Sequence, residues 1–285
     1  MTPRRTLTLT ALALLLAPGM VHAQDPERPT RWRRRAPQTA VPVTVFHSTQ
    51  ALNLPTAETI AQGEWLFEIS HRFLPEIGDT DAFLGFDGPI RNRIGLAYGL
   101  SDRVQLTLQR SNLDDNVDLN LRVRAYERGG SAPLMLALVA GGAWNTEVPG
   151  RSDGDDRNFQ YYFQGVANVG LGKRAAVGIV PTFVHNPYIR EPDADDAFAL
   201  GVNGALYLGE VVALVGEWNL TEARTDLRHD AGALGIQLET GGHFFKLEVT
   251  NALRMNPAQY PAGAASSFKP SNWHWGFNIT RLLAF

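Results

Sequence analysis

Apolar and polar residues alternate along most of this chain with a period of two. Because successive side chains of a β-strand point to opposite sides, this alternation predicts strands with one apolar face and one polar face. Charged groups are costly in a dry core, so a charged face predicts contact with water. In the clearest segment, residues 116–126, one face carries Val117, Leu119, Leu121, Val123 and Ala125, and the other carries Asp118, Asn120, Arg122 and Arg124.

The alternation predicts about twelve strands joined by connections that are alternately short and long. Short turns such as 101–103 and 172–174 separate long links such as 74–91 and 145–158, provided that the medium link near 114–115 counts as long. Outer-membrane barrels have short periplasmic turns and long extracellular loops. We therefore predict an all-β fold, a transmembrane antiparallel up-and-down β-barrel over residues 64–285. The first strand begins at Glu64, and the others cover 92–100, 104–110, 116–126, 134–144, 159–171, 176–184, 197–208, 211–220, 231–239, 243–251 and 273–285.

The last predicted strand ends in an aromatic residue, as the closing strand of an outer-membrane barrel does. Its alternate positions include Phe277, Ile279, Leu283 and Phe285, and Arg281 is the one charged residue among them. We expect these four residues to form the insertion signal that the barrel-assembly machinery binds. The tail alone does not exclude the buried last strand of a soluble sandwich, but the alternating connection lengths favour the barrel.

The N-terminal residues have the pattern of an export signal. Arg4 and Arg5 precede a short apolar run, and Val21-His22-Ala23 provides small residues at the cleavage positions. This pattern predicts a signal peptide over residues 1–23, cut after Ala23. We expect residues 24–63 to form a largely irregular periplasmic segment, and the mature protein to reside in the outer membrane of a Gram-negative bacterium.

Residues 93–103 read RIGLAYGLSDR, which matches a hairpin motif R-I-G-x-x-Y-G-x-[ST]-D-R, and similar matches occur at 71–73, 83–88 and 276–281. With these segments the chain resembles a bacterial outer-membrane β-barrel family of unknown function. The resemblance covers roughly residues 45–285. It implies a membrane barrel loosely related to transporter-like barrels, with no established substrate.

The charged residues on the predicted inner faces suggest what the barrel does. Their mixed signs would form either a polar channel or a salt-bridged interior that keeps the barrel shut, and a twelve-stranded barrel is intermediate between filled and open barrels. The leading hypothesis is a channel or transporter for a small polar solute. The alternatives are a non-conducting structural or receptor barrel, and a barrel enzyme acting on envelope lipid or peptide. The candidates that line the lumen are Glu68, Arg72, Arg93, Asp118, Arg122, Arg124, Glu217, Glu239, Lys246 and Glu248.

Other candidate sites lie in the predicted extracellular loops. Carboxylates at alternate positions can bind a hard cation, although solvated loop charge is the alternative interpretation. His185 and His229, with Asp226 and Asp230 nearby, could serve a rim enzyme, but we expect no catalytic residue and no cofactor. The expected partners are outer-membrane lipid and lipopolysaccharide, and the net charge of −3 argues against nucleic acid. The candidate metal ligands are Asp153, Asp155, Asp156, Asp193, Asp195 and Asp196.

Overall fold

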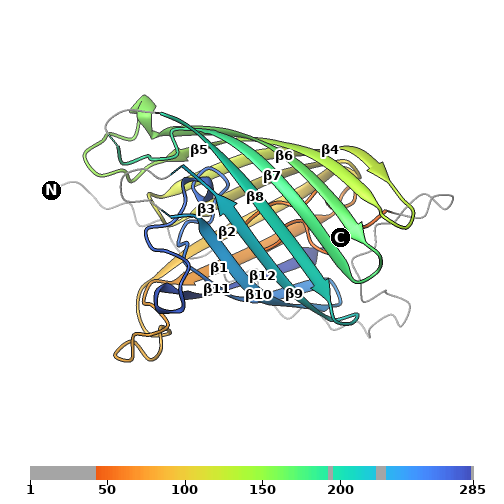
Figure 1. The fold of residues 1–285 in the computed structure, drawn as a ribbon. Helices are drawn as coiled ribbons and strands as arrows, with labels where there is room; N and C mark the ends of the chain where they lie inside the picture. The colour runs from red at the N-terminus through yellow and green to blue at the C-terminus, as the bar shows by residue number, and fades with distance from the viewer. Residues whose placement is uncertain (1–42, 192–194, 223–228, 284–285) are drawn as a thin grey trace, which may run out of the picture.

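The chain forms a closed antiparallel barrel of twelve strands, in which each strand pairs with its neighbours in sequence and β1 pairs with β12 (Figure 1). The computed structural model describes residues 43–191, 195–222 and 229–283. The predicted fold class is confirmed, because every predicted strand is present with bounds close to those expected. The strands are β1 (Trp65–Phe73), β2 (Ile90–Ser101), β3 (Val104–Ser111), β4 (Asn116–Arg128), β5 (Leu134–Asn145), β6 (Phe159–Leu171), β7 (Ala175–His185), β8 (Asp196–Tyr207), β9 (Val212–Leu220), β10 (Ala231–Thr240), β11 (His243–Thr250) and β12 (His274–Leu283).

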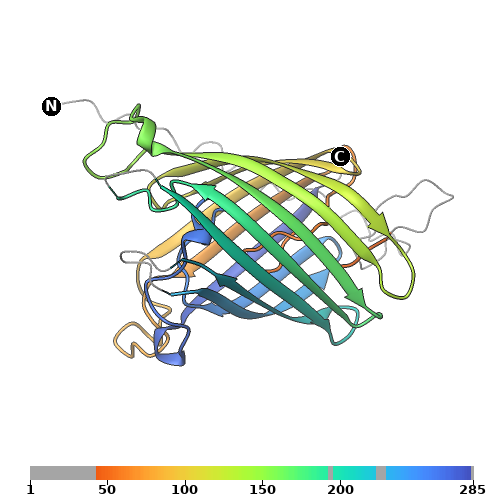
Figure 2. The ribbon, with the colours of Figure 1, turned by 45° about the horizontal axis from the view of Figure 1, so that its top comes forward.

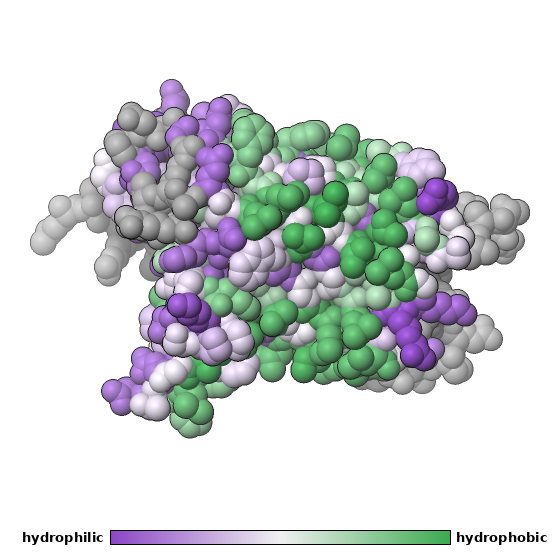
Figure 3. All heavy atoms as spheres, in the orientation of Figure 1, coloured by the Kyte–Doolittle hydropathy of each residue, from purple (hydrophilic) through white to green (hydrophobic). Residues whose placement is uncertain are grey.

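Exposed and buried residues alternate along each strand, as a two-faced wall requires. In β4, Leu119 and Leu121 are exposed on the outside, whereas Asp118, Asn120 and Arg122 are buried inside. The outward leucines, valines and aromatics form an apolar surface around the middle of the barrel (Figure 3). This surface is the lipid-facing band of a transmembrane barrel. In the part of the chain that the structure describes, no helix is long and apolar enough to cross a bilayer.

The two rims of the barrel differ in the length of their connections. One rim carries the tight turns at 102–103, 172–174, 208–211 and 241–242, and the other carries the long loops. Figure 2 shows the strands running obliquely between these rims. We call them the short-turn rim and the long-loop rim, and by the architecture of outer-membrane barrels the short-turn rim faces the periplasm.

Residues 43–63, which we call the plug, lie inside the barrel, where Figure 2 shows their red-orange trace. The plug passes Tyr207 and Glu239 near the short-turn rim, since the His47 main-chain N–H donates to the Tyr207 hydroxyl at 3.1 Å and its Nδ1 lies 2.8 Å from Glu239. It turns back at Asn53 and returns to the same rim, where the Gln62 main-chain N–H donates to Asp102 at 3.0 Å. The expectation that residues 24–63 are periplasmic is therefore wrong for residues 43–63. Lumen side chains hold the plug by its main chain, and the plug does not pair into the sheet. Its sequence therefore lacks the alternation of a strand, and the alternation could not place it. Residues 1–42, with the expected signal peptide, lie outside the described residues.

A second segment folds over the opposite end of the lumen. Residues 251–273, which we call the mouth loop, contain a buried stretch that includes Met255, Asn256, Ala258 and Tyr260. Side chains of the wall bind its main chain: Gln160 Nε2 donates to the Ala258 carbonyl at 3.3 Å. The barrel interior is thus filled by two segments that are not strands of its sheet.

Candidate functional site

The inner wall of the barrel differs in chemistry from one side to the other. Inward residues of β5, β7 and β8 are mostly small and apolar, among them Ala137, Val180 and Ala205. The charged residues predicted to line the lumen lie on the remaining strands, and all ten face inward, nine of them buried and Glu68 nearly so. They divide into five carboxylates and five cations, so the wall can compensate its own charge.

Glu217 of β9 binds the point at which the plug reverses direction. Its carboxylate accepts hydrogen bonds from three successive main-chain N–H groups, those of Leu52 at 3.0 Å, Asn53 at 2.9 Å and Leu54 at 3.0 Å. The side-chain amide of Asn53 donates a further bond at 2.8 Å. Successive main-chain N–H groups that converge on one anion form a concave anion site. A buried carboxylate is costly unless it is bonded in this way, so the plug compensates the burial of Glu217.

Two cations of the wall bind plug carbonyls. Lys246 Nζ donates to the Gln50 and Ala51 carbonyls, both at 2.7 Å, and to the Ser48 hydroxyl at 3.0 Å. An ammonium group has three donors, so these bonds satisfy it completely. Arg122 donates to the carbonyls of Thr49 and Glu58, each at 2.8 Å, and thereby joins the incoming and outgoing arms of the plug.

Arg72 and Asn278 bind the plug from the β1–β12 side. Arg72 donates to the Asn53 side-chain oxygen at 2.9 Å and to the Asn278 side-chain oxygen at 2.9 Å, and it pairs with Glu248 at 2.5 Å. Asn278 in turn donates to the Leu52 carbonyl at 2.8 Å. The side-chain NH2 group of Asn53 therefore donates to the Glu217 carboxylate, and its side-chain oxygen accepts from the Arg72 guanidinium.

The other predicted lumen residues have different contacts. Arg93 pairs with Glu68 and donates to the Met255 carbonyl of the mouth loop, and Glu239 binds His47 of the plug. Asp118 and Arg124 are bonded within the wall: Asp118 accepts from the Tyr162 hydroxyl at 3.0 Å, and Arg124 donates to the Asp102 carbonyl at 2.6 Å.

The plug and the mouth loop meet beside Glu217. Tyr260 of the mouth loop is 2% exposed. Burial first, and then the negative charge of Glu217, raise the pKa of the Tyr260 hydroxyl well above its ordinary value. The phenol therefore stays protonated and neutral next to the carboxylate that binds the plug.

Glycines of β8 and β10 accommodate the leucines that flank Asn53. A Cβ at Gly201 would lie 2.7 Å from Leu54 Cδ1, and a Cβ at Gly235 would lie 3.3 Å from Leu52 Cδ2. The missing side chains leave the space that the leucines fill. A Cβ at Gly99 would lie 2.0 Å from the Ala61 carbonyl oxygen. Glycines of the wall therefore allow the plug to approach closely.

The acidic loop residues do not converge on a cation site. Among residues 43–191, 195–222 and 229–283, no three His, Cys, Asp or Glu side chains are grouped as metal ligands. Asp155 pairs with Arg157 at 2.7 Å, and Asp196 lies 2.7 Å from His185. Asp153 contributes its main-chain carbonyl to the indole of Trp144. Asp193 lies outside the described residues, as do Asp226 and Phe285.

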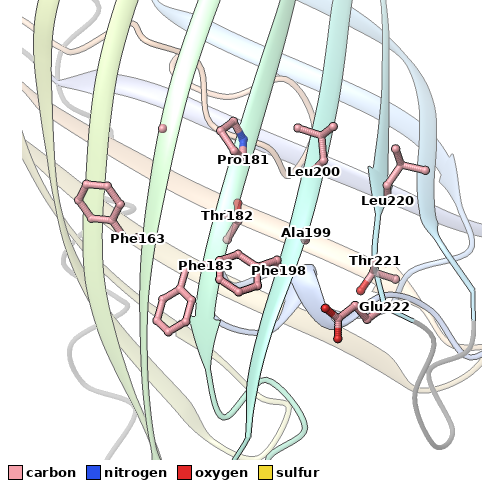
Figure 4. A pocket seen from close by; sticks show the side chains of 11 residues that line it. Phe163, Pro181, Thr182, Phe183, Phe198, Ala199, Leu200, Leu220, Thr221 and Glu222 are labelled. Carbon is pink, nitrogen blue, oxygen red and sulfur yellow. The ribbon is translucent and has the colours of Figure 1, made fainter.

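The outer wall carries an apolar hollow that is separate from the lumen. Figure 4 shows it between Phe163, Pro181, Phe198 and Leu200, and Gly165 also lines it. Proline lacks the N–H that a strand ladder needs, and the β6–β7 pairing is interrupted beside Pro181. The hollow lies on the lipid-facing surface, as do the predicted signal residues Phe277 and Ile279, whose positions in β12 alternate with buried ones.

Sequence reasoning missed the plug and the neutral wall residues that bind it. Asn168 accepts from the Ala57 main-chain N–H at 2.5 Å, and Gln105 accepts from that of Ile60 at 3.2 Å. The signal that could have indicated the plug is the apolar composition of residues 51–54, Ala-Leu-Asn-Leu, within a segment that has no strand period.

Comparisons with known proteins agree with the fold. The family described as a membrane bound beta barrel domain (DUF5777) matches residues 46–283. The outer-membrane family expected from the sequence is supported at that level, while the hairpin motif stays a prediction. No curated protein matches the chain in sequence.

Solved structures of similar shape include two porins. The NanC porin is 8% identical, with 76% of this chain and 98% of that chain covered and a TM-score of 0.48. The KdgM porin in complex with disordered oligogalacturonate is 7% identical, with 77% and 99% covered and a TM-score of 0.47. Outer membrane phospholipase A from Escherichia coli is 12% identical, with 78% and 89% covered and a TM-score of 0.41. Likeness at this level carries no argument about activity.

Proposed function

This chain belongs to the family of membrane-bound β-barrel domains, and from that premise we propose that it forms an outer-membrane channel for a small polar solute. The plug closes the passage in the conformation described. An even number of antiparallel strands, short turns on one rim and long loops on the other are characteristic of outer-membrane barrels.

The observation that carries the proposal is that the plug is bound to the wall without being part of it. β1 pairs with β12 on one side and with β2 on the other, so no strand edge depends on the plug. Within the plug the one bridge joins Gln50 to Pro55, which are both plug residues. The barrel therefore stays closed on itself when the plug leaves.

The chemistry of the plug contacts also favours a removable segment. Glu217, Lys246 and Arg122 hold it by hydrogen bonds to main-chain groups. Water can replace such bonds, so their net contribution to stability is about 1 kcal/mol each, rising to roughly 1.5–3 kcal/mol when one partner is charged. After release, the same side chains would line a hydrated passage of mixed charge.

Planar-bilayer recording tests the proposal with the full chain and with a variant that expels the plug. The double change Leu52→Asp and Leu54→Asp places two carboxylates beside Glu217 and inside the apolar pockets, where like charges repel and burial is costly. We expect the unchanged chain to be mostly silent and the double variant to show stepwise current.

A matched control carries the same added charge outside the lumen. Phe83 and Leu84 are exposed in the loop between β1 and β2, so Phe83→Asp with Leu84→Asp should leave the recordings of the parent unchanged. Folding is checked by the heat-dependent mobility of each variant on detergent gels. A folded Leu52→Asp/Leu54→Asp variant that carries no current would contradict the channel and favour a receptor or structural barrel.

A further inference from the structure

The wall contacts of the plug are directed at peptide main-chain atoms more than at side chains. Glu217 accepts from the N–H groups of Leu52, Asn53 and Leu54, and Lys246 donates to two successive carbonyls. Every peptide carries these donors and acceptors, whatever its sequence. The inner wall thus presents a set of groups complementary to a reversed peptide main chain.

Neutral side chains extend the same pattern along both arms of the plug. Asn278 donates to the Leu52 carbonyl at 2.8 Å, and Asn203 donates to that of Pro55 at 3.4 Å. Asn168 accepts from the N–H of Ala57. Together with those of Glu217, Lys246 and Arg122, these main-chain contacts come from β4, β6, β8, β9, β11 and β12, so six strands contribute to the recognition of one short segment.

The most specific side-chain contacts of the plug are at the turn. The spaces opened by Gly201 and Gly235 take two leucines that flank one central residue, and that residue, Asn53, contacts both Glu217 and Arg72. The site therefore favours a turn with an apolar side chain on each side of a small polar one. Elsewhere in residues 48–58, Lys246 donates to the Ser48 hydroxyl and Arg93 donates to the Gln50 side-chain oxygen.

We infer that the lumen of this barrel is a binding site for short peptides, and that residues 48–58 occupy it as a tethered ligand. This inference rests on the proposed function and names its substrate class: the polar solute is a peptide, and the plug excludes it by taking its place. A tethered ligand has a high effective concentration, so a free peptide gains access only when the plug is weakened or withdrawn.

The test uses the full chain with the plug weakened and the wall intact. The Leu52→Asp/Leu54→Asp variant is purified in detergent and titrated with a fluorescent synthetic peptide of residues 48–58, followed by anisotropy. A second peptide with N-methyl groups on Leu52 and Leu54 keeps every side chain but lacks two of the N–H donors that Glu217 accepts. We expect the first peptide to bind and the N-methylated peptide to bind at least tenfold more weakly.

Wall variants in the same background locate the bound peptide. Glu217→Ala should weaken binding at least tenfold, while Glu210→Ala, an exposed residue at the short-turn rim, should leave it unchanged. If the double plug variant does not fold, Asn53→Ala replaces it, since that change removes only the side-chain contacts to Glu217 and Arg72.

The outcomes separate the inference from the proposed function. Absence of peptide binding to folded protein, or equal binding of the N-methylated peptide, overturns the inference. Current without peptide binding leaves the channel standing and removes the peptide as its ligand. Peptide binding without current supports the peptide site and turns the protein into a receptor barrel.

Discussion

The plug and the mouth loop both fill the lumen without joining the sheet, but different chemistry holds them. Charged side chains, Glu217 and Lys246 above all, bind the plug main chain. Amide groups dominate the contacts of the mouth loop, such as Asn256 with Asn116 and Gln259 with the Leu113 carbonyl. Contacts with ionised groups are stronger and more sensitive to the loss of one partner. A single substitution of a charged wall residue should therefore release the plug. The mouth loop is held by several neutral contacts, so one substitution should affect it less.

Removal of the Glu217 carboxylate should have the largest effect. Glu217→Ala leaves three plug N–H groups without their charged acceptor, and loss of one partner from a buried charged contact costs about 3–5 kcal/mol. Hydrogen exchange followed by mass spectrometry should show protection at residues 52–54 falling on the order of a hundredfold or more. Mouth-loop protection at residues 255–259 should change much less. Equal loss of protection in both segments would show that they form one unit, and would contradict a plug that is held separately from the mouth loop.

Lys246→Met should have the next largest effect. Methionine approximates the length of the lysine stem but gives no donor to the Gln50 and Ala51 carbonyls. The expected loss of plug stability is about 2 kcal/mol, within the range for hydrogen bonds to charged groups. Plug opening can be measured as the rate of protease cleavage within residues 43–63. Lys173→Met, in an exposed turn, is the control and should cleave at the parental rate.

A change in the mouth loop should be smaller and local. Asn256→Ala removes the 2.5 Å contact with the Asn116 side chain and should cost about 1 kcal/mol. We expect faster hydrogen exchange in residues 255–259 and an unchanged current in planar bilayers. A rise in current from this variant would assign gating to the mouth loop rather than to the plug.

The smallest effect should lie outside the lumen, in the loop between β5 and β6. Hydrogen bonds from the Arg157 side chain and main chain hold the pKa of Asp155 at about 2. Because the pKa of Asp155 in the folded protein is below its ordinary value near 3.9, this contact stabilises the loop at a pH above that ordinary value. The stabilisation is lost as the pH falls toward 2. NMR titration of the Asp155 carboxyl should show this low midpoint, and Arg157→Gln should raise it, with no change in plug protection. An unshifted midpoint would contradict the contact.

The strands could be predicted from sequence and the plug could not, for a physical reason. A strand such as β4 carries its own period, because its outer face meets lipid and its inner face meets polar groups in the lumen. The contacts of the plug are long-range: Asn53 and Glu217 are separated by 164 residues. The ten charged residues could be predicted to face the lumen because each lies on the polar face of an alternating strand. Their contacts with the plug could not be predicted, because main-chain groups are the same whatever the side chain.

A reversible link between the plug and the wall shows whether the plug closes a conducting lumen. The chain contains no cysteine, so Leu54→Cys with Gly201→Cys gives one thiol on the plug and one on the wall. The first change also removes the methyl group that a Cβ at position 201 would approach. A short linker that forms a disulfide bond with each thiol joins the two, and a reductant cleaves these disulfides during a planar-bilayer recording. We expect no current while the link is intact. After reduction we expect stepwise current, because Leu54→Cys also removes the leucine that fills the space at Gly201 and so weakens the plug. The same current before and after reduction of a fully linked sample, or no current in either state, would contradict closure of a conducting lumen by the plug.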